Sequence, residues 1–482
     1  MRYDSPLEQQ VGTNRIGLTE TPILDALKAV RQRKIVSFHA LPLSQMENEQ
    51  DLPGIDDFNI ISSEFIRSLD MTYTGALFDN PVVPKKCIEE STLLTASAFS
   101  ADYTAYITCG TTIANYIAVN SLTSEGDRVL VERSSHQSIH FALIKNKNKV
   151  TYIKNQMFEP TSGRYFMDTE AMLQELRSAK EGTDPYKLVI LNGCSYEGVL
   201  KNQRKLLEQI LSIDESVSIL IDEAWLSFGY FHNYYEDYCA LKAARSLGLD
   251  SRTASIIVTQ SAHKTLLSIR QGSYLHMIGS DTLRERIRCE LYSMHTTSPS
   301  YPILASLELA RADAAEHGYD RVEDRLKYVD YVRQFVSNTE GYSINESAYF
   351  CDEYQSIDPL KMSINVSQIT TDVKRYKEAL FDKFDIYIKN ITDSSFLVAI
   401  HYGITEKRIK KFIKALYLLA NTLRNCHLTD TAVDLSDEYI IPYPPGIPLL
   451  VPGEQVSYQL IQQIDRLKKC GIDIFSVKGR RP

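Results

Sequence analysis

Between residues 103 and 260 the chain alternates short apolar runs with segments of helical periodicity. The apolar runs are rich in valine, isoleucine and leucine, as in Arg128–Glu132 and Ser218–Asp222. Such runs are typical of strands that are buried on both faces of a parallel sheet and joined by crossover helices. The alternation therefore predicts an α/β fold with a mostly parallel, doubly wound sheet over about residues 90–290.

The expected elements are short and closely spaced. We expect strands at Ala105–Thr108, Arg128–Glu132, Lys149–Lys154, Lys187–Asn192, Ser218–Asp222 and Ser255–Thr259. We expect helices at Thr111–Leu122, Ser138–Lys145, Asp168–Lys180 and Lys201–Ile213.

The sequence on either side of this region does not show the same regular alternation of strands and helices. A short helix is predicted at Pro22–Arg33, because proline is favoured at the first position of a helix. After residue 299 we expect two helices, Ile303–Glu316 and Arg321–Ser337, and then a mixture of strands and helices. We therefore predict an N-terminal segment (1–90), a large domain (91–310) and a smaller α+β C-terminal domain (311–482).

The C-terminal part contains the proline-rich run YPPGIPLLVPGE at residues 443–454. Proline lacks a backbone donor and fixes its own φ angle, so this run is predicted to be extended. A helix is expected after it, at Val456–Lys469.

Composition excludes several classes of protein. The net charge of −8 argues against a nucleic-acid binder, which usually carries a basic patch. No apolar run reaches the roughly 18 residues of a membrane span, and the first ten residues lack an apolar signal core. The eight cysteines include no CxxC pair, which argues against a metal site or a disulfide framework. We expect a cytoplasmic protein whose partner is a small molecule.

Three polar stretches follow predicted strands or a turn. Lys264 ends the sequence QSAHK after the strand at 254–259, and Asp222 ends the strand SILID. The stretch Thr108–Thr112 forms a turn at the start of a helix. Ligands of open α/β sheets bind at the carboxyl ends of the strands, so we expect these stretches to meet there.

Each stretch also has an ordinary interpretation. A lone lysine is usually solvated, Asp222 could cap a helix, and Thr111-Thr112 is a good N-cap. His136, in RSSHQS, could be an exposed loop residue. Together, however, a phosphate cradle, a strand-end acid and a strand-end lysine indicate an enzyme that uses pyridoxal 5'-phosphate (PLP).

Eight motifs along the chain strengthen that hypothesis. In order they are TCGTTIAN, GDRVLVERSSHQSIH, YEGV, IDEAW, SAHKTL, QGSYLH, MHTTSPSYPILAS and YPPGIPLLVPGE. In this order they resemble the bacterial ornithine/lysine/arginine decarboxylases, which are PLP enzymes of the aspartate-aminotransferase fold (fold type I). The resemblance covers about residues 20–310 and again 440–456.

The resemblance implies a role for each matching position. Lys264 would hold PLP as a Schiff base, and Asp222 would keep the pyridine nitrogen protonated. His136 would stack on one face of the ring and Ala224 would pack on the other. The phosphate would be bound by Gly110, Thr111, Thr112, Ser261 and His263.

The resemblance also implies a dimer. Thr297 or Ser298, in MHTTSPSY, would reach the phosphate of a neighbouring subunit. The active sites would then be composite, in a homodimer or an assembly of dimers.

Some positions depart from the family pattern. Residues 38–44 (FHALPLS) replace a turn that contains glycine and histidine in relatives, and Gln137 replaces a lysine. Arg270 stands where a small residue is common. The additional N-terminal wing domain and longer C-terminal region of the acid-inducible branch are not expected here. The cofactor residues therefore match the family, whereas the identity of the substrate stays open.

Three functions are compatible with this pattern. The first is decarboxylation of a basic amino acid to an amine and CO2, with Glu454 meeting the distal cation and Trp225 either contacting substrate or packing in the core. The second keeps PLP but acts as an oxidase, deaminase or aminotransferase. The third is a silent regulatory homologue, which the presence of Lys264, Asp222 and His136 disfavours.

Overall fold

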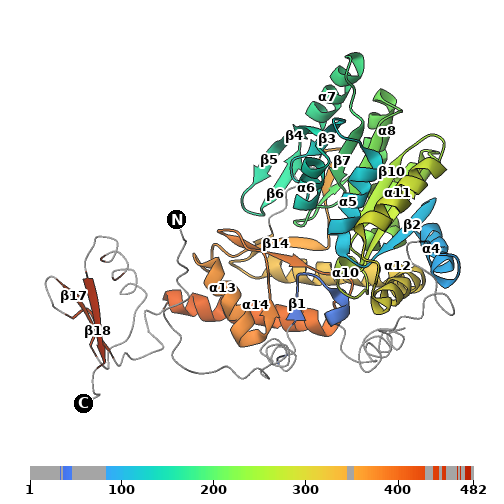
Figure 1. The fold of residues 1–482 in the computed structure, drawn as a ribbon. Coiled ribbons are helices and arrows are strands. Elements are labelled where there is room, and N and C mark those ends of the chain that lie inside the picture. The colour runs from blue at the N-terminus through green and yellow to red at the C-terminus, as the bar shows by residue number, and fades with distance from the viewer. Residues whose placement is uncertain are drawn as a thin grey trace, which may run out of the picture.

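The computed structural model describes residues 33, 36–45, 83–344, 352–428, 438–443, 448–451, 464, 467 and 473–478. Its centre is a seven-stranded sheet with the strand order β2-β11-β10-β9-β7-β3-β4 (Figure 1). The strands are β2 (Tyr103–Ile107), β3 (Arg128–Glu132), β4 (Lys149–Ile153), β7 (Leu188–Asn192), β9 (Ser218–Asp222), β10 (Ile256–Gln260) and β11 (Ser273–Ile278).

Most neighbouring strands of this sheet are parallel. β4, β3, β7, β9 and β10 run in one direction, whereas β11 is antiparallel to both β10 and β2. The prediction of a mostly parallel sheet is confirmed, but β11 was not predicted. Only residues 261–272 separate it from β10, and a turn with Gln271 at φ 76° sends the chain back beside that strand.

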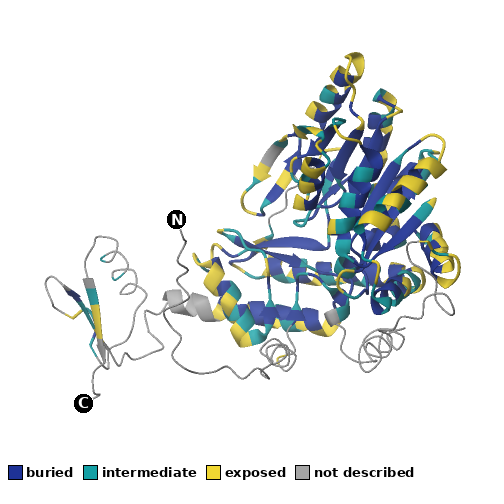
Figure 2. Cartoon of the chain, viewed as in Figure 1, coloured by how far each residue is buried: buried dark blue, intermediate teal, exposed yellow. Residues whose placement is uncertain are grey.

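Helices cover both faces of the sheet. They are α4 (Cys87–Ala98), α5 (Gly110–Leu122), α6 (Gln137–Lys145), α7 (Thr169–Glu181), α8 (Gln203–Ile213), α9 (Ala240–Ser246), α10 (Ala262–Thr265) and α11 (Asp281–Met294). Ile219 and Ile221 of β9 join one hydrophobic core, and Leu220 between them joins the other. β9 is thus buried on both faces, whereas Lys149 and Tyr152 of the edge strand β4 are exposed. Figure 2 shows the buried strands between the helices.

A single helix, α12 (Tyr301–Asn338), connects the large sheet to the rest of the chain. The prediction of two separate helices here was wrong, because Gly318 continues the helix instead of breaking it. A Cβ atom at Gly318 would lie 2.7 Å from the Cβ of Phe231. Close packing against Phe231 therefore outweighs the ~1 kcal/mol that glycine costs inside a helix.

A smaller antiparallel sheet follows, made of β12 (Ser343–Ile344), β14 (Lys361–Asn365) and β16 (Ser395–Ala399). Two helices accompany it, α13 (Val373–Phe384) and α14 (Glu406–Leu428) (Figure 1). The other short strands form pairs: β1 (Val36–Ser37) with β15 (Ile386–Tyr387), β5 (Asn155–Glu159) with β6 (Arg164–Met167), β8 (Val199–Lys201) with β13 (Gln355–Ile357), and β17 (Glu438–Tyr443) with β18 (Asp473–Lys478).

Two of these pairs join distant parts of the sequence. β1 binds the chain just after α13, and β13 binds the chain just after β7. The domain boundaries at residues 90 and 310 stay a prediction. The helices expected at Pro22–Arg33 and Val456–Lys469 fall almost wholly outside the described residues. None of the helices in the described part of the chain combines the length and apolar character that a bilayer crossing requires.

Candidate active site

A cavity of about 740 Å³ lies at the carboxyl ends of β7, β9 and β10, next to the first turn of α5. It brings together most of the residues predicted from the sequence. These are Gly110, Thr111, Thr112, His136, Asp222, Ala224, Trp225, Ser261, His263 and Lys264.

Lys264 lies in α10, the short helix that follows β10. Its Nζ atom is 4.7 Å from the centroid of the Trp225 ring. Burial lowers the pKa of the Lys264 amine below its usual value, and the nearby Asp222 carboxylate partly opposes this shift. The site therefore favours the neutral, nucleophilic form of the lysine more than water does.

Asp222 is a buried carboxylate with both oxygens hydrogen-bonded. Oδ1 accepts from the backbone N–H of Ala224 at 3.0 Å, and Oδ2 accepts from Nδ2 of Asn115 at 3.0 Å. Asn115 is itself fixed, because its Oδ1 accepts from the Thr259 hydroxyl at 2.6 Å. The carboxylate is thus held rigidly at the end of β9.

Sequence reasoning missed the role of Asn115, although the residue stands in the motif TCGTTIAN. Asn115 comes four residues after Thr111, so the two share one face of α5. A polar residue on the face that carries a predicted phosphate ligand was the signal that could have identified it.

The end of the cavity at α5 is suited to an anion. The hydroxyl of Thr111 lies 2.6 Å from that of Ser261 and 2.7 Å from that of Ser273. Gly110 begins α5 with φ +80° and donates its own amide to the Gln271 carbonyl oxygen at 3.0 Å, whereas the Cys109 side chain does not cap the amides that follow it. Free amides at a helix N-terminus and clustered hydroxyls form a binding site for phosphate.

Two further side chains border this end of the cavity. His263 Nδ1 lies 2.8 Å from the Gly272 carbonyl oxygen. Burial lowers the pKa of the His263 ring to about 4, so at neutral pH the ring is uncharged and its one N–H, on Nδ1, is donated to the Gly272 carbonyl oxygen. Arg270 also lines the cavity and can supply the positive charge that an anion needs. The sequence had marked Arg270 only as unusual.

His136 occupies the N-cap of α6, where its ring is fixed by Ser138. The backbone N–H of Ser138 donates to Nδ1 at 3.2 Å, which makes Nδ1 an acceptor and places the ring proton on Nε2. Burial lowers the pKa of His136, so the ring is neutral and can pack against a flat ligand. Ala224 is buried against the same cavity.

The predicted contacts to a neighbouring subunit lie elsewhere. Thr297 and Ser298 are exposed in the segment after α11 and do not line the cavity of their own chain. This segment begins at His295, whose Nε2 accepts from the backbone N–H of Thr108 at 3.0 Å. Glu454 lies outside the described residues.

A second cavity, of about 30 Å³, adjoins the first and shares Trp225 and Lys264 with it. Its other walls come from β14, α12 and the segments after β1 and β16. Apart from Lys264, the sequence did not point to the basic and acidic side chains of this cavity as site residues: His39, Arg325, Asp358, Lys361 and His401. They are scattered over more than half of the chain and are adjacent only in the folded protein.

Trp225, the single tryptophan of the chain, separates the two cavities. The Nζ atoms of Lys264 and Lys361 lie 4.7 Å and 4.8 Å from its ring centroid. His39 and Tyr196 also pack near its ring. Its position at both cavities is the feature that distinguishes Trp225 from a tryptophan of the core.

Comparison with known proteins identifies the family. Residues 21–352 match the family model described as Orn/Lys/Arg decarboxylase, major domain, and residues 411–471 match the C-terminal domain of the same family. An arginine decarboxylase of Bacillus subtilis (strain 168) is 26% identical over 94% of this chain and 95% of its own length. The inducible lysine decarboxylase of Escherichia coli (strain K12) is 27% identical over 57% of this chain and 38% of its own.

Solved structures share the architecture. The Francisella novicida lysine decarboxylase LdcF matches with a TM-score of 0.65 and 18% identity, over 94% of this chain and 81% of that one. Serine palmitoyltransferase of Sphingomonas wittichii matches with a TM-score of 0.57 and 13% identity, over 84% of this chain and 98% of that one. The predicted α/β architecture of fold type I PLP enzymes is confirmed. Because one family model covers more than half of its length, the chain belongs to the Orn/Lys/Arg decarboxylase family.

Proposed function

We propose that the protein is a PLP-dependent decarboxylase that converts a basic amino acid, such as arginine, lysine or ornithine, into an amine and CO2. The observation that carries this proposal is the meeting of Lys264, Asp222 and His136 at one cavity. Family membership and the decarboxylase names of the relatives support it.

The residues of the large cavity fit PLP. Asp222 offers a fixed carboxylate for the pyridine nitrogen, and His136 and Ala224 offer packing surfaces for a flat ring. The first turn of α5 with Ser261 offers donors for the phosphate, and Lys264 offers an amine for the aldehyde. When bound, PLP withdraws electrons from the bonds of the substrate α-carbon, which allows a carboxylate to leave as CO2.

The protein's own residues hold the reacting groups in place and transfer protons to and from them. Asn115 and the Ala224 amide hold the Asp222 carboxylate where it keeps a proton on the pyridine nitrogen. The lowered pKa of Lys264 makes it easier for its amine to give up a proton and take it back beside the substrate carbon. The Trp225 ring, between the two cavities, limits the access of water to that amine.

We further propose a homodimer, or an assembly of dimers, with composite sites. Thr297 and Ser298 are exposed at the end of a segment fixed beside β2, where a second copy can meet them. Large apolar side chains are also exposed on three helices of the large domain: Leu93 (62%) on α4, Ile144 (66%) on α6 and Tyr292 (69%) on α11. A second copy that covered them would remove apolar surface from water.

Complementation tests the composite site. Chains with Lys264→Ala are mixed with chains altered at both Thr297 and Ser298, each nearly inactive alone. Mixed dimers should regain one working site, because one chain supplies the lysine and the other supplies the phosphate contacts. If subunit exchange is demonstrated and no activity returns, the sites are built within single chains.

The reaction itself is tested with the loaded enzyme and a panel of amino acids. We expect a visible absorption band from bound PLP, and stoichiometric CO2 and amine from one basic amino acid. Release of H2O2 or ammonia would instead reveal an oxidase or deaminase, and a keto acid without CO2 would reveal an aminotransferase. Roles for Trp225 and Glu454 in binding the substrate, and a cytoplasmic location, stay predictions.

A further inference from the structure

Arg325 of α12 is a buried arginine that lacks partners for most of its donors. It is 2% exposed, and its Nη1 donates to the Arg321 carbonyl oxygen at 3.2 Å. Its Nε and Nη2 have no hydrogen-bond partner within the described part of the chain. A guanidinium in this state is costly, because two of its three nitrogens have lost water without gaining an acceptor. Burial accordingly lowers the pKa of Arg325 to about 10.

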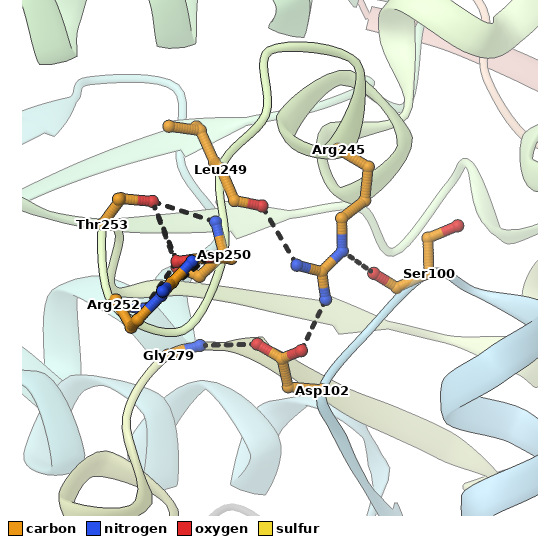
Figure 3. Close-up of polar contacts among 8 residues, drawn as sticks. All are labelled: Ser100, Asp102, Arg245, Leu249, Asp250, Arg252, Thr253 and Gly279. Carbon is orange, nitrogen blue, oxygen red and sulfur yellow. Dashed lines mark hydrogen bonds and ion pairs between the residues drawn. The ribbon is translucent and has the colours of Figure 1, made fainter.

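Arg245 shows that the chain can provide a hydrogen-bond acceptor for each nitrogen of a guanidinium elsewhere. Its Nε donates to the carbonyl oxygen of Ser100 at 3.1 Å, and its Nη1 donates to that of Leu249 at 3.0 Å (Figure 3). Its Nη2 forms an ion pair with Asp102 at 2.6 Å. Every nitrogen of Arg245 thus has an acceptor. The missing acceptors of Arg325 therefore reflect its particular surroundings and are not a general feature of arginines in this chain.

The acids near Arg325 have other partners. Asp313 forms an ion pair with Arg321 and accepts from the Tyr402 hydroxyl at 3.2 Å. Asp358 accepts from the Tyr235 hydroxyl at 2.8 Å, and its charge interacts with Lys361. Neither carboxylate is hydrogen-bonded to Arg325. A further anion would therefore be attracted to this guanidinium.

The unpaired donors have a specific geometry. Nε and Nη2 lie on the same edge of a guanidinium, and their N–H bonds are the parallel pair that binds a carboxylate through both oxygens. Arg325 lines the small cavity that also contains Lys264 and Trp225. The cavity volume of about 30 Å³ is room for about two water-sized atoms, which are the two oxygens of a carboxylate.

The other walls strengthen the attraction for an anion. They include Phe228, Val322, Leu360 and Ile400, and an apolar lining makes a charge interaction stronger than it is in water. Burial lowers the pKa of His39 to about 4 and that of His401 to about 3, so both rings are neutral at pH 7. Lys361 offsets the charge of Asp358, whereas Nε and Nη2 of Arg325 have no partner among the described residues.

We propose that the small cavity binds the carboxylate of the amino-acid substrate, and that Arg325 holds it through Nε and Nη2. This inference rests on the proposed function, since it places that carboxylate next to Lys264. Arg325 would bind the full charge of the carboxylate in the free amino acid, and that charge decreases as CO2 departs. Its interaction is then stronger in the ground state than in the transition state, so it contributes to KM more than to kcat. Arg325 is then a binding residue that favours the amino acid over its amine product.

Trp225 provides a test that needs neither cofactor nor turnover, because it is the only tryptophan and lines the cavity. Its fluorescence is followed while acetate, as a minimal carboxylate, is added to the full-length protein at constant ionic strength with chloride. We expect a saturable change with acetate and none with chloride. In Arg325→Met the apparent affinity should fall at least about tenfold, as expected for the loss of a charge-assisted hydrogen bond.

Two further variants control this test. Arg325→Lys keeps the charge but loses the paired donors, so it should bind acetate more weakly than the wild type and better than Arg325→Met. Arg245→Met removes a paired guanidinium far from the cavity and should leave the acetate response unchanged. Arg325→Met should unfold at the same temperature as the wild type or a higher one, because a buried unpaired charge has been removed.

The second arm uses the loaded enzyme and compares L-arginine with agmatine, L-lysine with cadaverine and L-ornithine with putrescine. The wild type should bind the preferred amino acid at least about tenfold more tightly than its amine, and Arg325→Met should lose this preference. If acetate leaves Trp225 unchanged, or affects Arg325→Met equally, the cavity holds only water and the inference is overturned. An acetate response without CO2 production would instead contradict the proposed function and leave the carboxylate site standing.

Discussion

The two cavities on either side of Trp225 differ in how their polar groups are satisfied. In the large cavity, Asp222, Asn115 and Thr111 are hydrogen-bonded to other parts of the protein. In the small cavity, Arg325 keeps two buried donor atoms, Nε and Nη2, without a partner in the described chain. The polar groups of the large cavity have their hydrogen bonds before a ligand arrives. The guanidinium in the small cavity would gain its missing acceptors only from a ligand.

This difference indicates a division of labour. A cofactor that stays bound through many turnovers is best served by fixed groups, because their orientation costs nothing when the reaction occurs. A substrate that arrives and leaves can itself satisfy the groups that it meets. The predictions below test this contrast, from the largest expected effect to the smallest.

Asp222→Asn should cause the largest loss, since the fixed carboxylate is the centre of the large cavity. The variant should still bind PLP but turn over at least about a hundredfold more slowly, because a buried charge pair is worth several kcal/mol and each ~1.4 kcal/mol is tenfold in rate. The measurement is kcat at matched cofactor occupancy. A variant that keeps more than about a tenth of the wild-type rate would show that Asp222 does not pair with the pyridine nitrogen.

Glu223 is a buried carboxylate that is hydrogen-bonded and yet has no positive partner to balance its charge among its contacts in the described part of the chain. Its oxygens accept from the Ala240 amide at 2.7 Å and the Gln260 side chain at 2.9 Å, yet burial raises its pKa from 4.5 to about 7. A raised carboxyl pKa favours the folded state below about pH 4.5, and this stabilisation is lost as the pH rises towards 7. The wild type therefore bears the cost of a buried charge above pH 7.

Glu223→Gln should remove that cost. Its amide can donate to the unpaired Oε1 of Gln260 once the Gln260 side chain flips. Relative to the wild type, the free energy of unfolding should rise by on the order of 3 kcal/mol at about pH 8, with a much smaller difference near pH 5. Denaturant unfolding at the two pH values measures it. An equal difference at both would show that Glu223 does not titrate in this range.

Asn115→Ala should have the smallest of these effects. It removes one of the two donors to Asp222 and leaves the Thr259 hydroxyl without its acceptor. We therefore expect kcat to fall about tenfold, the equivalent of one hydrogen bond to a charged group. The absorption band of the bound cofactor should also shift, which a purely structural role would not cause. Asn120→Ala, on the same helix but bonded to Glu290, is the matched control and should be nearly neutral.

The sequence predicted the large cavity well, for a physical reason. Asp222 ends β9, Lys264 lies in the short helix after β10, and Gly110 begins α5. Strand ends of a parallel sheet converge on one edge. The periodicity that located β9 and β10 therefore also located the site. The exception on this side was Asn115, whose importance depends on contacts with Thr259 and Ser138 that no local pattern shows.

The small cavity could not be predicted in the same way. His39 enters because β1 pairs with β15, and Arg325 enters because α12 continues through Gly318. Asp358 lies in the turn between β13 and β14, and Lys361 is the first residue of β14. Each of these placements depends on long-range packing, and an arginine in a long helix gives no sign that its donors are buried and unpaired.

The central claim is that Lys264 carries the cofactor in a decarboxylase. Borohydride reduction of the loaded protein fixes PLP to the lysine that holds it, and peptide mapping by mass then identifies that lysine. We predict one modified peptide, the one that contains Lys264, with loss of CO2 production in parallel and no modified peptide in Lys264→Ala. Modification of Lys361 or any other lysine in the wild type, with Lys264 unmodified, would contradict the account.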